Sequence, residues 1–211
     1  MGDTGQRFAQ LKRMLLDAGM RPTPDTTPAR PRLRDLGALA GDVERVYREL
    51  GGQLPGSKLL PGPWDLSMDE VMIELDEGQH FNRYRAMTLD PDWSAALPWH
   101  ADYERYCDEQ EHECLRVASH QGFWTNQSTE LMFGPPGERA DLSGRGSPRW
   151  RQRAVYDAMR DAYALEHATK MARVCVHDDV DGHRLENVLG GRATVPSHAV
   201  RELVERRTLT H

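Results

Sequence analysis

The feature that most constrains the fold is an alternation of apolar and polar side chains within residues 63–81, which read Pro-Trp-Asp-Leu-Ser-Met-Asp-Glu-Val-Met-Ile-Glu-Leu-Asp-Glu-Gly-Gln-His-Phe. Two short strands, 64–68 and 71–76, joined by a tight polar turn at Asp69-Glu70, explain this alternation, because successive side chains of a strand point to opposite faces. Pairing about the turn places Asp65 opposite Glu74. The paired residues are Met68 with Val71, Ser67 with Met72, Leu66 with Ile73, and Asp65 with Glu74.

The two faces of this predicted hairpin differ in chemistry. One face is entirely apolar and consists of Trp64, Leu66, Met68, Val71, Ile73 and Leu75. The other face carries three carboxylates and consists of Asp65, Ser67, Met72, Glu74 and Asp76. Like charges opposite each other destabilise a strand ladder, so the acids are expected to hold a cation. Mg²⁺ prefers carboxylate oxygens, which makes it the expected ion.

Composition bounds the class of protein. The chain has 211 residues, a hydrophobic fraction of 38% and a net charge of -6, which fits one domain with a core. The negative charge implies that any contact with nucleic acid comes from local patches. No apolar run approaches the roughly 20 residues of a membrane span, and the first eight residues lack a secretory signal. We therefore expect a cytoplasmic protein without membrane contact.

The cysteine and histidine pattern favours neither a disulfide framework nor structural zinc. The chain has three cysteines, Cys107, Cys114 and Cys175, with no Cys-x-x-Cys pair. This odd, sparse set does not build a disulfide scaffold.

Spacing and turn residues predict the order of elements. Helices are expected at 4–18, with Phe8, Leu11, Leu15 and Leu16 on one side, at 33–50, 81–89, 101–119, from Ser147-Pro148 to about Ala164, and at 197–207. Residues 20–32 form a proline-rich linker, 121–146 are irregular, 178–182 form a turn, and further strands are expected at 57–60 and 171–177. The predicted fold is a mixed α/β domain, 33–211, with a small sheet flanked by helices and an insertion at about 90–146, preceded by a segment 1–32.

The acidic strand and the residues after it resemble the PD-(D/E)XK, or restriction-endonuclease-like, nuclease superfamily, and within it the branch of very-short-patch-repair endonucleases. That branch has an Asp on one strand and Glu-x-Asp-Gly-x-x-His on the next. Asp65, Glu74, Asp76 and His80 match these positions in type and spacing. This chain departs from the branch by placing Glu77 where the branch has Gly, with Gly78 one position later. Asp76 stands in place of the lysine usual in the superfamily, as the branch also departs from lysine.

The resemblance implies a restriction-endonuclease-like fold and a Mg²⁺- or Mn²⁺-dependent nuclease, with DNA as the expected substrate. Asp65, Glu74 and Asp76 would hold the metal, which polarises a phosphate and lowers the pKa of a bound water. His80 would act as general acid or base, and Gln79 would orient water or phosphate. The alternative for these residues is a solvated acidic strand face with a histidine in a turn.

Two groups of arginines are candidates for phosphate binding. Arg83 and Arg85 follow the acidic strand directly, and Arg149, Arg151 and Arg153 open the helix that begins after Ser147-Pro148. For the second group the sequence favours the alternative of an ordinary solvated helix face, whereas for the first group a solvated face and phosphate binding explain the arginines equally well. Phe81 and Tyr84 could stack on bases, although aromatic side chains at helical spacing usually belong to the core.

A rival function remains open. The negative net charge, the presence of only three lysines and the Glu77 departure favour a non-catalytic interaction protein that retains a nuclease-like fold. In that case the polar stretch 90–146 would be its surface for a protein partner.

Overall fold

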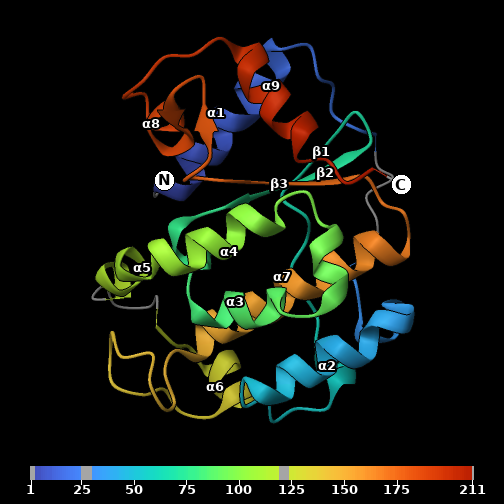
Figure 1. The fold of residues 1–211 in the computed structure, drawn as a ribbon, viewed down its shortest axis with the longest axis vertical. Coiled ribbons are helices and arrows are strands. Elements are labelled where there is room, and N and C mark those ends of the chain that lie inside the picture. The colour runs from blue at the N-terminus through green and yellow to red at the C-terminus, as the bar shows by residue number, and fades with distance from the viewer. Residues whose placement is uncertain (1–2, 25–29, 119–123, 211) are drawn as a thin grey trace. The chain divides into compact units, whose positions relative to one another are not determined.

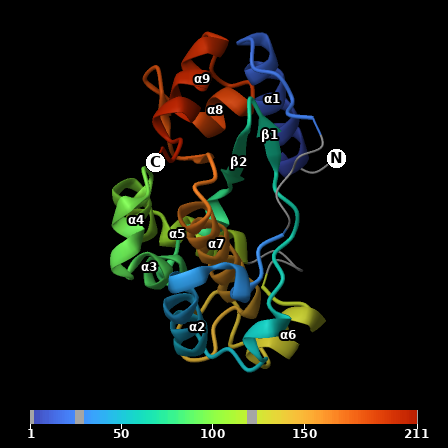
Figure 2. The same ribbon diagram turned by 90° about the vertical axis from the view of Figure 1, so that its right-hand side faces the viewer.

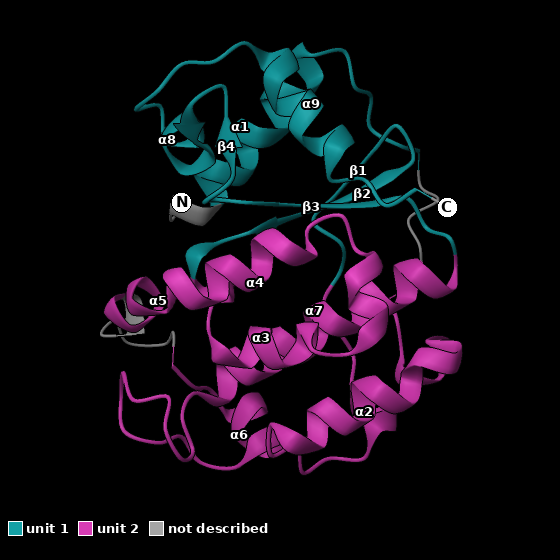
Figure 3. Ribbon diagram, viewed as in Figure 1, with its two compact units in different colours: residues 1–29, 63–78, 168–211 teal, residues 30–62, 79–167 magenta. Residues whose placement is uncertain are grey.

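The computed structural model describes residues 3–24, 30–118 and 124–210. The chain divides into two compact units, and it passes between them four times (Figure 1 and Figure 3). Unit 1 comprises residues 1–29, 63–78 and 168–211, and unit 2 comprises residues 30–62 and 79–167. This division differs from the boundary expected at residue 32. The class is mixed α/β with small sheets, as predicted.

The central element of unit 1 is a three-stranded mixed sheet in the order β1-β2-β3. Strand β1, Leu66–Met68, pairs antiparallel with β2, Val71–Asp76, and β2 pairs parallel with β3, Met171–Cys175. The observed partners Leu66–Ile73, Ser67–Met72 and Met68–Val71 confirm the predicted register. A one-residue slip would have moved the whole apolar face to the other side, so the pattern specified this register strongly.

The turn of this hairpin uses left-handed backbone at two residues that are not glycine. Asp69 has φ 47° and Glu70 has φ 65°, as a two-residue hairpin turn requires. The turn is fastened to an adjoining segment, because the backbone N–H of Glu70 donates to Oγ1 of Thr23 at 2.9 Å and that of Arg21 donates to Oδ1 of Asp69 at 3.1 Å. These bonds offset the cost of left-handed backbone.

Both edges of the sheet are covered by short bridges. Pro22 forms an antiparallel bridge with Met68 beside β1, and Thr208 forms one with Ala172 beside β3. Proline suits such a position because it has no N–H to offer an open edge. Covering an edge prevents its unpaired backbone groups from recruiting another chain.

The apolar face of the hairpin packs into the core of unit 1. Helix α1, Asp3–Asp17, contacts α8, Leu185–Leu189, and α9, Ser197–Arg206, and Figure 2 shows α1 beside α9. The N-terminal helix therefore belongs to the same core as the hairpin. The buried members are Leu11, Met14, Leu15, Met20, Leu66, Met68, Ile73, Leu75, Ala172, Val174, Val180, Leu185, Val188, Leu189, Val195, Val200, Leu203 and Val204.

Two details of unit 1 differ from the prediction. Leu16 was expected on the buried side of the first helix, but it is 43% exposed, and Met14 takes part in the core instead. The expected turn at 178–182 includes a short strand, β4, Asp179–Val180, which pairs antiparallel with β5, His183–Arg184, just after that segment.

Unit 2 is helical in its described part. Its elements are the 3-10 helices η1 Leu33–Asp35, η2 Gly37–Leu39, η3 Gly56–Lys58 and η5 Asp92–Ala96, and the α-helices α2 Ala40–Glu49, α3 Arg83–Leu89, α4 His100–Glu109, α5 Glu111–Ala118, α6 Gln127–Phe133 and α7 Pro148–Glu166; η4, Gly78–His80, leads into it. The strand expected at 57–60 is wrong, because η3 occupies that segment. The helix expected at 101–119 is two helices, and α6 lies in the stretch expected to be irregular.

Helix α7 organises unit 2 by packing against α2, α3 and α6. Its start confirms the prediction, because the Oγ of Ser147 accepts from the backbone N–H of Trp150 at 3.2 Å and Pro148 occupies the first helical position. The buried members of this core are Leu36, Val43, Val46, Tyr47, Leu50, Leu59, Tyr84, Cys114, Trp124, Met132, Phe133, Leu142, Trp150, Ala154, Val155, Met159 and Ala162. None of the helices in the described ranges has the length and apolar content needed to cross a bilayer.

Candidate functional site

At the start of the hairpin, the backbone of Asp65 is hydrogen-bonded to the side chain of Glu74, and the side chain of Asp65 is hydrogen-bonded to the backbone of Leu75. The backbone N–H of Asp65 donates to Oε1 of Glu74 at 3.2 Å, and the backbone N–H of Leu75 donates to Oδ2 of Asp65 at 3.1 Å. Glu74 is 4% exposed, whereas Asp65 is exposed to solvent. The structure therefore brings these two predicted metal ligands together, one buried and one open to solution.

Asp76, the third predicted metal ligand, is paired with a buried arginine. The Nη1 of Arg173 on β3 donates to Oδ1 and Oδ2 of Asp76 at 3.0 and 2.9 Å, and the two side chains are at most 2% exposed. Arg173 is also the direct strand partner of Glu74. The guanidinium thus neutralises acidic charge on this face of the sheet.

Sequence reasoning missed Arg173, although the strand that carries it gave a signal. Arg173 stands in the largely apolar run Met-Ala-Arg-Val-Cys-Val of the strand expected at 171–177, a pattern typical of a buried strand. Arginine is rarely buried unless it is paired, so an acidic partner on the neighbouring strand could have been inferred.

Glu77, where the nuclease branch has Gly, has a defined partner in unit 1. Its Oε2 accepts from Nη1 of Arg7 on α1 at 2.5 Å, and Glu77 is 7% exposed. The departure therefore introduces an ion pair with the N-terminal helix.

His80 is oriented by a carboxylate of α7. Its Nδ1 lies 2.8 Å from Oδ2 of Asp157, and Asp157 also lies 3.7 Å from Nη1 of Arg160 through Oδ1. With Asp157 ionised, Nδ1 carries the proton and Nε2, on the opposite edge of the ring, is the nitrogen with a lone pair in the neutral imidazole. Such an orientation suits a general base.

Gln79 also contacts α7, through Arg153. Nη1 of Arg153 lies 3.4 Å from Oε1 of Gln79. This long hydrogen bond brings one predicted phosphate-binding arginine beside one predicted site residue, in unit 2. Asp157, which sequence reasoning missed, lies one helical turn after Arg153 on the same helix.

Two of the predicted phosphate-binding arginines do not lie on the surface. Arg85 is 1% exposed and donates to Oδ2 of Asp161 at 2.6 Å. Arg151 is 9% exposed, donates to the backbone oxygen of Gly144 at 2.8 Å and lies over the Tyr84 ring. Their guanidinium groups stabilise unit 2 from within.

The remaining residues of these groups have different surroundings. Arg83 is exposed and forms an ion pair with Glu111, and Arg149 is half-buried at the first turn of α7. Phe81 is buried and packs edge to face on Tyr103 at a centroid distance of 5.0 Å. Tyr84 lies in the core of unit 2. The two aromatic side chains therefore serve packing, as the alternative in the sequence predicted.

The model of a family of unknown function, DUF7255, matches residues 45–191. The chain belongs to this family. No curated protein and no solved structure matches it. The matched segment includes the candidate residues from Asp65 to His80 together with Asp157 and Arg173. The description of the family assigns no chemistry to these residues.

Proposed function

We propose that this protein is a metal-dependent nuclease that hydrolyses phosphodiester bonds in DNA, with a restriction-endonuclease-like arrangement of its sheet. The single observation that carries the proposal is the pair Asp65 and Glu74, in which the backbone N–H of Asp65 donates to Oε1 of Glu74 next to the paired strands of the hairpin. Two carboxylates from neighbouring strands form a donor set that suits Mg²⁺ or Mn²⁺.

Within unit 1, Asp65 and Glu74 are the residues best suited to hold the ion. Asp65 is open to solvent and ions, and the hydrogen bond from Leu75 fixes its Oδ2. Asp76 becomes a third metal ligand only if its carboxylate exchanges the ion pair with Arg173 for a bond to the metal. When bound, the metal supplies charge that polarises the phosphate and acidifies water.

Within unit 2, His80 is suited to proton transfer. The hydrogen bond from Nδ1 to Asp157 fixes the ring and its tautomer. Asp157 is 2% exposed, so it acts as a positioning residue that stabilises the imidazolium formed after a proton is taken up.

Calorimetric titration with MgCl₂ and MnCl₂ tests the metal site. Wild-type protein should bind, and Asp65→Asn and Glu74→Gln should each abolish binding while circular dichroism reports an intact fold. Glu70→Gln is the matched control, because it removes one negative charge from the same hairpin at a side chain that is 79% exposed. Equal affinity in wild type and both site variants would refute the metal site.

One observation favours a non-catalytic interaction protein instead. Arg173, which is fully buried, already provides the positive charge that a cation would bring to Asp76. Under this alternative, the guanidinium of Arg173 neutralises the carboxylate of Asp76, and the acidic strand needs no metal ion. Titration of the wild type with Mn²⁺ separates the two functions: under the nuclease proposal Asp65 and Glu74 bind the ion, and under the alternative the wild type does not bind it.

A further inference from the structure

Helix α7 carries two arginines on the same face as Asp157, the partner of His80. Arg153 lies one helical turn before Asp157, and Arg160 lies one turn after it. Residues at these spacings share one face of a helix. We call this face, formed by Arg153, Asp157 and Arg160, the arginine face. Because Nδ1 of His80 lies 2.8 Å from Oδ2 of Asp157, the imidazole stands between the two arginines along α7.

Neutral oxygen atoms hold both guanidinium groups of the arginine face. Nη1 of Arg153 donates to Oε1 of Gln79, and Nη2 of Arg160 donates to the backbone oxygen of Gly62, each at 3.4 Å. A bond to a neutral acceptor positions a guanidinium and leaves its positive charge in place. Asp157 lies 3.7 Å from Nη1 of Arg160 and brings one negative charge against the two positive charges. The arginine face therefore has a net positive charge, in a protein whose own net charge is -6.

The arginine face and its partners are in part open to solution. Arg153 and Gln79 are half-buried, and the side chain of His80 is 15% exposed. Arg160 is buried, so its guanidinium lies deeper. Burial lowers the local dielectric and strengthens the attraction between a guanidinium and an anion that reaches it.

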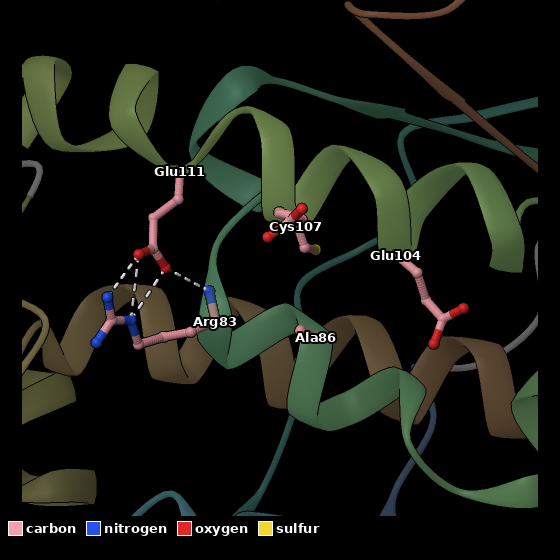
Figure 4. Close-up of a pocket in the computed structure, with 6 residues that line it drawn as sticks. Arg83, Ala86, Glu104, Cys107 and Glu111 are labelled. Carbon is pink, nitrogen blue, oxygen red and sulfur yellow. Dashed lines mark hydrogen bonds and ion pairs between the residues drawn. The ribbon is translucent and has the colours of Figure 1, made fainter.

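Two other arginines that the sequence suggested for phosphate binding already have close carboxylate partners. Nε of Arg83 donates to the carboxylate oxygens of Glu111 at 3.0 and 3.2 Å, and Nη2 donates to Oε1 at 2.6 Å (Figure 4). Arg85 donates to Oδ2 of Asp161 at 2.6 Å. A carboxylate bonded in this way neutralises the guanidinium and occupies its donors. These two arginines are therefore less suited to phosphate than those of the arginine face.

We propose that Arg153 and Arg160 bind phosphate groups of a nucleic-acid strand on either side of His80. Guanidinium groups form paired hydrogen bonds with phosphate oxygens, and such contacts position a strand without reading its sequence. The shared helix face, the neutral acceptors and the net positive charge carry this assignment. It rests on the proposed function for the identity of the ligand, and it specifies the backbone contacts that unit 2 supplies.

Binding of a fluorescein-labelled oligothymidylate to the full chain tests the arginine face. Anisotropy is measured in EDTA, which prevents metal-dependent cleavage, over a series of NaCl concentrations. Wild type should bind, and Arg153→Gln should weaken binding about tenfold and reduce the slope of log K against log [NaCl] by about 0.7. The matched control is Arg45→Gln, which removes the same charge from α2 at a residue paired with Glu49. The control should keep the salt slope of wild type.

Arg160 needs two variants because it is buried. Arg160→Gln should cause the same losses as Arg153→Gln where circular dichroism reports an intact fold. Arg160→Lys keeps the charge but loses the planar fork, so affinity should fall several-fold while the salt slope stays that of wild type. A purely structural role would leave the salt slope unchanged in both variants. If Arg160→Gln does not fold, Arg153→Gln and Arg160→Lys decide.

Three results would overturn the inference. The first is no binding of the oligonucleotide to wild type at a protein concentration of about 1 mM, at which a weak contact is still detected. The second is an equal salt slope in Arg153→Gln and Arg45→Gln. The third is calorimetric binding of pyrophosphate with the variant pattern above and no binding of the oligonucleotide, because the arginine face would then hold a small phosphate ion.

Failure of the proposed nuclease function gives a different result. If the oligonucleotide binds with the variant pattern above and is not cut after MgCl₂ or MnCl₂ is added, the nuclease function fails and the arginine face stands. Metal-dependent cleavage together with binding that is insensitive to Arg153→Gln and to Arg160→Lys would refute the arginine face alone.

Discussion

Arg173 donates from Nη1 to both carboxylate oxygens of Asp76, at 3.0 and 2.9 Å, across the parallel pairing of β3 and β2. The pair stands on the face of the sheet opposite Ile73 and Val174, which lie in the core of unit 1. A buried charge is costly when its partner is removed, whereas an apolar replacement of both partners is often tolerated.

Replacing Arg173 with Met should lower the free energy of unfolding by about 3–5 kcal/mol, because the Asp76 carboxylate stays buried without its guanidinium. The double variant Arg173→Met/Asp76→Leu should recover most of that loss. Urea denaturation measures both. Arg45→Met, which breaks the exposed pair with Glu49, is the control and should have little effect. If the double variant is as unstable as the single one, the loss of stability in Arg173→Met does not come from an unpaired carboxylate at Asp76.

Glu70→Gly should raise the free energy of unfolding by about 0.5–1 kcal/mol. Glu70 holds a φ of 65° in the hairpin turn, which glycine adopts without the strain of a Cβ. Glu70→Ala removes the same side chain but keeps the Cβ, so it should not stabilise the protein. The melting temperatures of the wild type and the two variants test this prediction. Equal stability of the Gly and Ala variants would contradict the claim that the backbone of Glu70 is strained.

The cysteines should be unreactive in the native protein at neutral pH. Burial raises the pKa of Cys107 and Cys114 to about 12 and that of Cys175 well above its ordinary 9.0. Reaction with a chromogenic disulfide should be slow at pH 8 and rapid in denaturant, because the thiolate is the reactive form. Rapid reaction of any cysteine in the native protein would contradict this burial.

The same shifts determine how stability depends on pH. Because the pKa of these thiols is higher in the folded chain than in the unfolded chain, a rise in pH deprotonates the thiols of the unfolded chain first. Their stabilisation is therefore complete below about pH 9 and is lost as pH rises towards 12. Urea titrations at pH 8 and pH 10 should show lower stability at the higher pH, and Cys107→Ser should reduce that difference.

Under the proposed function, Asp157→Asn should lower turnover by roughly 10- to 100-fold and leave the Mn²⁺ affinity unchanged. Asparagine can offer its amide N–H to Nδ1 of His80 and so permit the other tautomer. The pH dependence of turnover should therefore shift, which a merely structural role would not cause. Asp161→Asn, a change at the carboxylate paired with Arg85, controls for general loosening of α7. Unaltered turnover and pH profile in Asp157→Asn would exclude Asp157 as a positioning residue.

Local rules predicted the parts of this fold that depend on neighbouring residues. The register of β1 and β2 followed from a period of two, and the start of α7 followed from Ser147-Pro148. The seven-residue helix α6 was missed, because it is too short to show a helical period although it buries Thr129, Met132 and Phe133. The division into two units depends on contacts between segments far apart in the sequence, which periodicity does not report.

The candidate site shows the same limit. The pairing of Asp65 with Glu74 could be predicted, since both belong to one hairpin. The partners Arg173 and Asp157 lie 97 and 77 residues from Asp76 and His80. Only the chain's tertiary path brings them to their partners. Arg85 was expected at the surface from its position after the acidic strand, and its burial depends on Asp161 of α7.

Cleavage of DNA by the full chain tests the central claim most directly. Supercoiled plasmid and a single-stranded oligonucleotide should be incubated with wild type, Asp65→Asn, Glu74→Gln and the control Glu70→Gln, with MgCl₂, MnCl₂ or EDTA. The proposed function predicts metal-dependent cleavage by wild type and Glu70→Gln, none with EDTA, and at least about a hundredfold loss in Asp65→Asn and Glu74→Gln. Absence of cleavage by wild type with either metal, or equal cleavage by the site variants, would contradict it.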